Sequence, residues 1–134
     1  MEHPPHVFHW NDLPWDNPLA GADPARQPPK ELVDAARKSG AKRKKVVRGE
    51  AGFYMNRSTM GPGFRVPPHQ HDHDELIVVL SGGCVFDNGL ADLGPGDSIV
   101  IHGGTRYGFT CAEEGMEFLT IRTGEATVTL EPKS

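Results

Sequence analysis

The chain has 134 residues, a length that suits one domain with a single core. Hydrophobic residues make up 37% of it and charged residues 24%, while 16 Gly and 12 Pro predict many turns and therefore β structure. The formal charge of -4 excludes the basic field of a nucleic-acid-binding protein, so we expect a small-molecule partner.

The sequence offers no targeting or membrane signal. Its start, MEHPPHVFHWNDLPW, lacks an apolar core of signal-peptide length, and no later segment reaches the roughly 18 apolar residues of a membrane span. We therefore expect a cytoplasmic protein without a membrane partner. Two cysteines, Cys84 and Cys111, are too few for a disulfide framework and are expected to be buried, reduced thiols.

Residues 1–29 are rich in proline, which predicts an extended arm rather than a helix. The arm carries large apolar side chains that are costly to leave in water, so it is expected to pack on the barrel or on a second subunit; they are Val7, Phe8, Trp10, Leu13 and Trp15. Residues 30–39 follow two prolines and precede Gly40, which predicts one short helix. The predicted division is an N-terminal arm and helix, residues 1–43, and a barrel, residues 44–134.

Residues 42–45 form a basic run that continues into Val46 and Val47. We expect an edge strand whose charges face solvent and discourage unwanted pairing. A further strand follows, with Phe53, Met55 and Arg57 on one side and the residues between them on the other. The alternation does not tell which side faces inward.

The stretch from Gly63 to Gly82, GFRVPPHQHDHDELIVVLSG, holds the candidate metal ligands. Successive side chains of a strand point to opposite faces, so His69 and His71 share a face, and Glu75 lies a further even step along. Two imidazoles and a carboxylate on one side of an ion leave positions open for substrate or dioxygen. The alternative interpretation is a polar loop that binds no metal.

The spacing within this stretch is more specific than its ligands. A glycine, five residues, His69, one residue, His71, three residues, Glu75, six residues and a glycine strongly resembles the first signature of the cupin superfamily. The resemblance implies a double-stranded β-helix, a small all-β jelly-roll barrel with the ligands inside. It covers roughly residues 44–123 and leaves out the arm and helix.

Short strands broken by Gly, Pro and Asn follow and agree with a barrel. Leu76–Leu80 is wholly apolar and predicts a buried strand ended by Ser81–Gly83. Five more strands are expected, at 84–86, 98–102, 107–111, 116–122 and 126–130.

The second cupin signature is present with changes. With Gly96 at its start, His102 stands where proline is expected, and Tyr107 stands where a histidine would supply the last ligand. Tyr107 can be a fourth ligand, because a nearby ion can displace the phenolic proton. It can instead be the catalytic acid or base beside an ion held by the other three residues. In a third interpretation it is a wall residue of a protein that has lost its metal.

Other residues near the two signatures are secondary candidates. Arg65 and Arg106 are candidate binding residues for a substrate carboxylate, through paired hydrogen bonds. His102 is a candidate substrate-binding residue or displaced ligand, and His73 is an alternative to Glu75, which the family spacing favours.

The resemblance implies one divalent transition-metal ion, with Fe(II) favoured and Zn or Mn as alternatives, and a homodimer. The leading expectation is a small-molecule dioxygenase-type oxidoreductase. The alternatives are a non-redox, Zn-dependent lyase, isomerase or cyclase in which Tyr107 carries a proton, and a non-catalytic binding or sensing protein.

Overall fold

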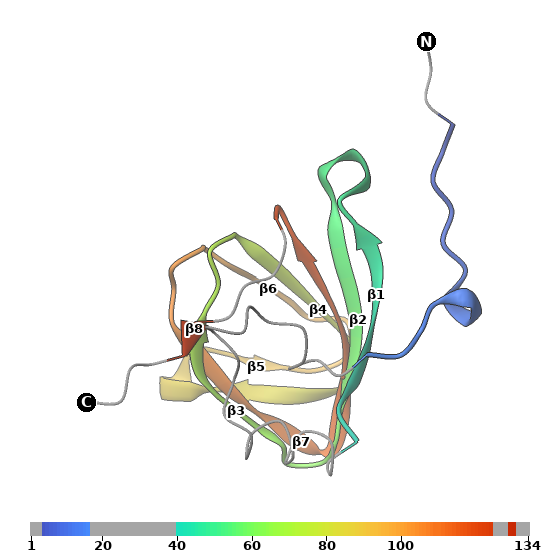
Figure 1. Cartoon of the computed structure of the whole chain (residues 1–134). Helices are drawn as coiled ribbons and strands as arrows, with labels where there is room; N and C mark the ends of the chain where they lie inside the picture. Colours follow the sequence, from blue (N-terminus) through green and yellow to red (C-terminus); the bar gives the residue numbers. More distant parts are fainter. Residues whose placement is uncertain (1–3, 17–39, 125–128, 131–134) are drawn as a thin grey trace.

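The computed structural model describes residues 4–16, 40–124 and 129–130, and the helix predicted at 30–39 lies outside them. The described chain is almost entirely β structure (Figure 1). Its strands are β1 (Lys42–Arg48), β2 (Tyr54–Met60), β3 (Arg65–Gln70), β4 (Glu75–Phe86), β5 (Asp92–Leu93), β6 (Ser98–Ile101), β7 (Tyr107–Arg122) and β8 (Thr129–Leu130). Short 3-10 turns occur at η1 (Trp10–Asp12), η3 (Glu50–Gly52) and η4 (Asp87–Gly89).

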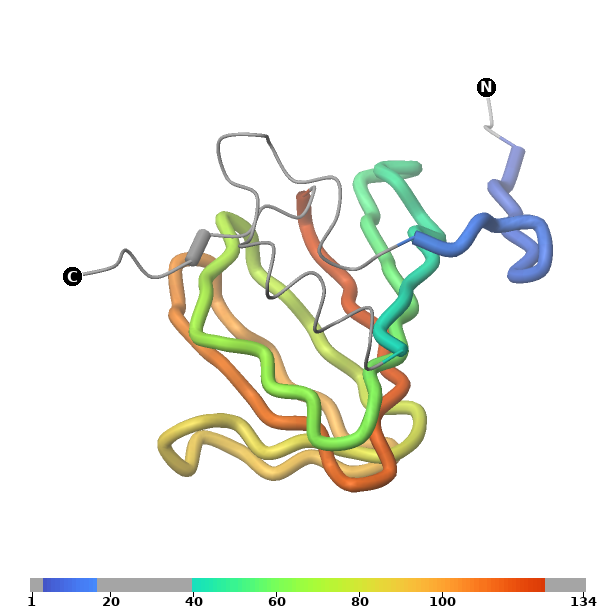
Figure 2. The backbone as a smooth tube through the Cα atoms, turned by 60° about the horizontal axis from the view of Figure 1, so that its bottom comes forward, coloured from blue at the N-terminus to red at the C-terminus, as the bar shows by residue number. Residues whose placement is uncertain are grey.

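Two long strands, β4 and β7, form the antiparallel spine of the barrel. Toward one end, β7 also pairs with β2, β2 with β1, and β4 with β6. Toward the other end, β7 pairs with β3, β3 with β8, and β4 with β5. The two groups of strands wrap around one interior (Figure 2), which confirms the predicted all-β jelly-roll barrel.

The predicted breaks in the spine were wrong. We expected strands at 76–80 and 84–86, and again at 107–111 and 116–122, but each pair is one continuous strand. The glycines and serine between them lie at shifts of the β4–β7 register, between Val79 and Ser81 and between Gly82 and Cys84. Such irregularities bend a strand without ending it, which lets one strand serve both sides of the barrel.

Gly82 shows why one of these bends requires glycine. Its φ is 68°, and a Cβ at this position would lie 2.0 Å from the carbonyl oxygen of Gly115 on the facing strand. No larger residue fits both the left-handed backbone and this close approach. Gly63, at the other end of the first signature, has a φ of 66° in the turn before β3.

Cross-strand pairing defines which side of the barrel wall faces inward. Ile77, Val79 and Phe118 are buried in the core, and their positions alternate with those of Leu76, Val78 and Leu119, which are only partly buried. In β2 the inward side holds Tyr54, Asn56 and Ser58, because Asn56 pairs with Thr120 and Ser58 with Phe118. The remaining residues of these strands form the outer face.

The N-terminal arm is fixed to β1 through its tryptophans. Asp16 makes a backbone bridge to Arg43, and Lys44 donates a hydrogen bond from Nζ to the Trp10 carbonyl oxygen at 2.7 Å. The Lys44 ammonium lies 4.1 Å from the centre of the Trp10 ring and 4.8 Å from that of Trp15. The expected solvent-facing basic edge is therefore wrong for Lys44, which is 5% exposed because the indoles cover it.

We searched residues 4–16, 40–124 and 129–130 for a helix that could span a membrane. None of their helices is long and apolar enough to cross a bilayer.

Candidate functional site

Four candidate side chains from the two signatures meet inside the barrel. His69 lies in β3 opposite Tyr107, the first residue of β7, and Glu75 opens β4. His71 lies just beyond the end of β3. All four are 2% to 7% exposed. The two imidazole rings are 4.9 Å apart edge to face, and the Tyr107 ring is 4.5 Å from that of His69.

Tyr107 connects His71 to Glu75. Its hydroxyl donates to Glu75 Oε1 at 2.6 Å and lies 3.1 Å from His71 Nε2. Since the single phenolic hydrogen goes to the carboxylate, the phenolic oxygen is free to accept a hydrogen from His71 Nε2. The order of donation is therefore His71, Tyr107, Glu75.

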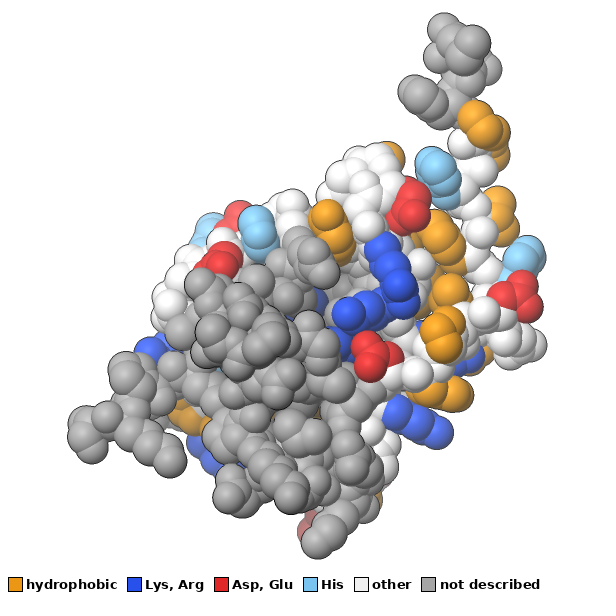
Figure 3. All heavy atoms as spheres, viewed as in Figure 1, with side chains coloured by type: hydrophobic (Ala, Val, Ile, Leu, Met, Phe, Trp, Pro, Cys, Tyr) orange, Lys and Arg blue, Asp and Glu red, His pale blue; other side chains and the backbone are white. Residues whose placement is uncertain are grey.

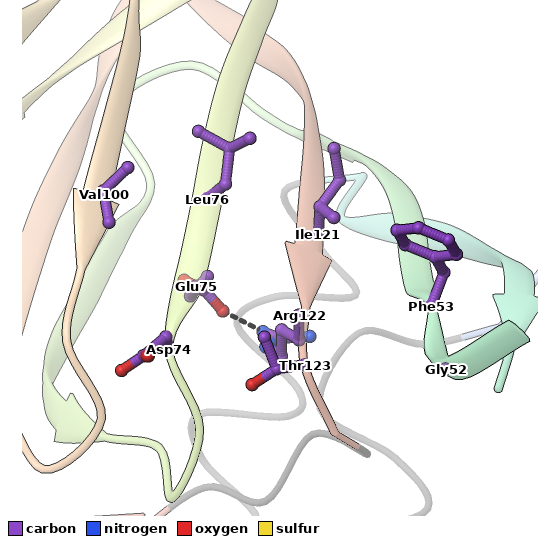
Figure 4. Close-up of a pocket in the computed structure, with 9 residues that line it drawn as sticks. All are labelled: Gly52, Phe53, Asp74, Glu75, Leu76, Val100, Ile121, Arg122 and Thr123. Atoms are coloured by element: carbon purple, nitrogen blue, oxygen red, sulfur yellow. Dashed lines mark ion pairs between the residues drawn. The ribbon is translucent and has the colours of Figure 1, made fainter.

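Arg122 completes this network, and the sequence analysis did not identify it. Arg122 is the cross-strand partner of Glu75, and its Nη2 forms an ion pair with Glu75 Oε2 (Figure 4). The two side chains are 9% and 1% exposed. A buried carboxylate needs such a partner. An arginine at an inward position of a strand was the available signal, but the pairing that brings it to Glu75 joins segments 47 residues apart.

His69 is held as a neutral ring with one nitrogen open. Its Nδ1 lies 2.9 Å from the Pro67 carbonyl oxygen, which can only accept, so Nδ1 carries the hydrogen and Nε2 the lone pair. Burial lowers the pKa of His69 to about 4, and the nearby His71 acts in the same direction. A neutral imidazole fixed through its other nitrogen is the form that ligates a metal ion.

Tyr107 is held as a protonated phenol. Burial raises its pKa well above 10, and the charge of Glu75 and the hydrogen bond to it act in the same direction. The hydroxyl is therefore a proton donor in the protein as it stands.

The possible donor atoms of His69, His71 and Glu75 lie near one another but do not converge on a common centre. Within the described part of the chain, no three His, Cys, Asp or Glu side chains are arranged as a metal site. The reason lies in the contacts above: the Tyr107 hydroxyl stands between His71 and Glu75, whose Nε2 and Oε2 atoms are 3.6 Å apart, and Arg122 holds the second carboxylate oxygen.

The other candidates lie outside this cluster. Arg65 forms a bidentate ion pair with Asp87 on the surface, with Nη1–Oδ1 and Nη2–Oδ2 distances of 2.6 and 2.7 Å. His102 is 85% exposed and lies 3.8 Å from Asp74, and Arg106 is exposed. His73 is half-buried and packs against Gly124, where a Cβ would meet its ring. The structure does not bring these residues to Glu75.

A pocket of about 240 Å³ opens beside the Glu75–Arg122 pair. Apolar side chains of the outer face line most of it, and Figure 4 shows Val100, Leu76, Ile121 and Phe53 arrayed across neighbouring strands. Asp74 and Thr123 stand near the ion pair.

The barrel topology and the buried cluster of His, Glu and Tyr side chains agree with the protein family that the comparisons identify. The cupin domain family matches residues 56–122, half of the chain, so the chain belongs to the cupin family. Comparison with the curated proteins gives no match.

Solved structures of the same fold include enzymes. The polyketide cyclase RemF from Streptomyces resistomycificus is 23% identical over 98% of this chain and 88% of its own, with a TM-score of 0.67. KdgF from Halomonas sp. is 20% identical over 91% and 96%, with a TM-score of 0.65. A variant of oxalate decarboxylase OxdC from Bacillus subtilis is 20% identical over 63% of this chain and 25% of its own, with a TM-score of 0.55. These similarities establish the fold.

Proposed function

We propose that this cupin is a metal-dependent enzyme of non-redox type, in which His69, His71 and Glu75 hold one divalent transition-metal ion and Tyr107 moves a proton to or from a small-molecule substrate. The observation that carries the proposal is the buried, protonated Tyr107 hydroxyl, fixed at 2.6 Å from Glu75 Oε1 and 3.1 Å from His71 Nε2. The similarity to a polyketide cyclase supports a substrate with a carbonyl group.

The donor set fits a metal ion. His69 offers Nε2 with its lone pair, Glu75 offers Oε1 while Arg122 retains Oε2, and all the groups are buried. His71 fits after one change: its Nε2 must give up its hydrogen and its contact with Tyr107. Imidazole and carboxylate together suit Fe, Mn and Zn. Such an ion, when bound, supplies a Lewis acid that polarises a carbonyl oxygen.

The protein's own residues supply the remaining steps. Glu75 Oε1 accepts the phenolic hydrogen and so orients the Tyr107 hydroxyl. Arg122 forms an ion pair with that carboxylate and holds it in place. The rings of Phe86 and Phe109 lie 5.8 and 6.5 Å from the Tyr107 ring and exclude water from it. A positioned acid or base of this kind accelerates proton transfer by about 10²–10⁴-fold.

A dioxygenase with the same three ligands is the second candidate. The observation that favours it is that two imidazoles and one carboxylate, His69, His71 and Glu75, all come from β3, the start of β4 and the turn between them; this is the ligand set that would hold the Fe(II) of a non-haem oxygenase. In this case Tyr107 is not required for proton transfer.

Metal content and proton exchange test the proposal. Purified protein is stripped, reloaded with Zn²⁺ or Fe²⁺ and analysed for metal; wild type and Tyr107→Phe should each hold one equivalent, and the His69→Ala/His71→Ala double variant none. Deuterium exchange beside the carbonyl, followed by NMR on a panel of small carbonyl compounds, should require metal and fall at least about 100-fold in Tyr107→Phe.

Three results would contradict the proposal. Absence of metal uptake by the wild type would favour the non-catalytic binding protein. A coloured ferric form that loses its visible band in Tyr107→Phe would make Tyr107 a ligand. Consumption of dioxygen in the presence of a substrate would favour the dioxygenase.

A further inference from the structure

The two cysteines of the chain lie opposite each other on the spine of the barrel. Cys84 of β4 is the cross-strand partner of Cys111 of β7. Each side chain is 3% exposed, and both are free thiols. Two residues further along the strands, the next pair with the same inward orientation is Phe86 and Phe109. The two thiols therefore share the inner side of one strand pair.

Backbone hydrogen bonds show which kind of cross-strand pair the cysteines form. The Cys111 amide donates to the carbonyl oxygen of Phe64, just before β3, at 2.8 Å. The Phe86 amide donates to the carbonyl oxygen of Ala91, just before β5, at 2.7 Å, and Cys84, two residues earlier, turns its amide the same way. Neither cysteine thus spends its amide on the other. Theirs is a non-hydrogen-bonded pair, the kind in which facing Cα atoms are about 4.5 Å apart and side chains are closest.

Such a pair is close to the geometry of a disulfide. A disulfide joins residues whose Cα atoms are about 4.4–6.8 Å apart and whose Cβ atoms are about 3.5–4.5 Å apart. Facing residues of antiparallel strands have Cβ atoms about 4.5–5.5 Å apart, at the short end in non-hydrogen-bonded pairs. Only a small approach of the strands is needed. The β4–β7 register shifts between Gly82 and Cys84, and an irregular ladder of this kind adjusts more easily than a regular one.

The environment of the thiols determines which oxidant suits them. Burial raises the pKa of Cys84 to about 11 and that of Cys111 to about 12, and the neighbouring Cys84 adds to the second rise. Both groups are therefore protonated at neutral pH and react slowly. The barrel face in Figure 3 mixes Lys and Arg with Asp, Glu and apolar side chains, so it presents no concentrated charge to attract an ionic oxidant. A small, neutral hydroperoxide meets these conditions.

We propose that Cys84 and Cys111 form a redox-sensitive pair, which a hydroperoxide converts into a disulfide that joins β4 to β7. One thiolate attacks hydrogen peroxide, so that the O–O bond breaks, an S–O bond forms and the cysteine becomes a sulfenic acid. The second thiolate attacks that sulfur, so that the S–O bond breaks, the S–S bond forms and hydroxide leaves. In total, two thiols and one hydrogen peroxide give one disulfide and two water molecules. The proposal does not depend on the metal site.

The pair lies next to the packing around Tyr107. Phe86 is two residues from Cys84, Phe109 is two residues from Cys111, and their rings lie 5.8 and 6.5 Å from the Tyr107 ring. A disulfide that draws β4 and β7 together moves the backbone that carries both phenylalanines. Oxidation of the pair therefore changes the surroundings of the Tyr107 ring.

Peptide mapping tests the chemical step. The full chain is treated with hydrogen peroxide at about pH 9, where more of each thiol is ionised, and digested without reduction. The wild type should give a cross-linked peptide that contains Cys84 and Cys111, two hydrogens lighter than the separate peptides and separated again by dithiothreitol. Cys84→Ala and Cys111→Ala should each give a sulfenic acid that dimedone traps, and no cross-link within the chain. A folded wild type that gives no cross-link would overturn the proposal.

Calorimetry shows whether the bond fits the native fold. The oxidised protein should have a Tm roughly 5–10 °C higher, because the bond closes a loop that is otherwise free in the unfolded chain. The part of the rise that dithiothreitol reverses belongs to the disulfide, since dithiothreitol does not reduce oxidised methionine. A Tm lowered by the bond would overturn its fit to the native structure.

Tyrosine NMR shows whether the bond affects the candidate site. The chain has two tyrosines, so protein with labelled tyrosine rings gives two sets of signals, which Tyr107→Phe assigns. The Tyr107 signals should shift on oxidation and return with dithiothreitol, and those of Tyr54, which lies on β2, should change less. Unchanged Tyr107 signals in a protein that contains the disulfide would overturn the link to the site.

Discussion

At the scale of single residues, Arg122 is the cationic partner of the buried Glu75 carboxylate. The ion pair is nearly inaccessible to water, so removal of one partner leaves a charge that neither solvent nor another cation compensates. We expect Arg122→Met to destabilise the metal-free protein by about 3–5 kcal/mol. Urea unfolding measures this value. A double-mutant cycle with Glu75→Gln checks its origin, because the loss should be much smaller when the carboxylate is also absent; additive losses would contradict the explanation.

His69 sets a second expectation, for acid stability. Its pKa is about 4 in the folded protein against 6.5 in an open chain, so the unfolded state binds a proton first as the pH falls. The stability that neutral His69 contributes is therefore complete above pH 6.5 and is lost progressively toward pH 4, by about 3 kcal/mol in all. Unfolding free energies of metal-free wild type and His69→Gln, compared at several pH values, measure this; parallel pH profiles would rule it out.

The contrast between these two residues shows how far a sequence leads toward a site. His69, His71 and Glu75 occur within one short segment, so their convergence follows from spacing, and the position of Tyr107 follows from the second signature. Arg122 comes to Glu75 only through the register of β4 against β7. Register depends on long-range packing and bends, and the sequence does not display it. The metal-binding role of the first three residues stays a prediction.

At the scale of elements, the same limit explains the strands. Their alternation predicted a β barrel, but Ser81 and Gly82 were interpreted as strand ends when they are bends within β4. Lys44 was expected in solvent because a basic run on an edge strand is usually solvated. Trp10, one of the two indoles that cover it, lies 34 residues earlier in the chain. Local pattern predicts the type of an element well, and it cannot identify what packs on it.

The contact between the arm and β1 makes a clear prediction for Lys44. Its ammonium donates to the Trp10 carbonyl and lies over both indoles, so Lys44→Met should loosen the arm at a cost of about 1–3 kcal/mol. The chain has two tryptophans, both in the arm, so tryptophan fluorescence reports on the surroundings of the arm. Emission should shift to the red in Lys44→Met. Lys45→Met, which alters a contact of 3.9 Å to Asp16, should leave it nearly unchanged; equal shifts would refute a specific role of Lys44.

At the scale of the whole molecule, the candidate centre joins parts of the barrel that are distant in sequence. His69 belongs to β3 and Glu75 to β4, while Tyr107 and Arg122 stand at the two ends of β7. An ion held by His69, His71 and Glu75, as proposed, would bind the folded state more tightly than the unfolded one, because only the fold fixes the three donors in one arrangement. Metal binding must then appear as global stability, whatever the substrate is.

The size of that effect follows from mass action. Zn²⁺ at about a hundred times its dissociation constant should stabilise the protein by about 2.7 kcal/mol, which corresponds to a rise of roughly 10 °C in Tm for a chain of this size. Calorimetry with and without Zn²⁺ measures the rise. His69→Gln/His71→Gln should show none, whereas Tyr107→Phe should show at least the wild-type rise, because it loses no ligand and frees His71 Nε2 from the phenol. A smaller rise in Tyr107→Phe would mean that the phenol itself binds the ion.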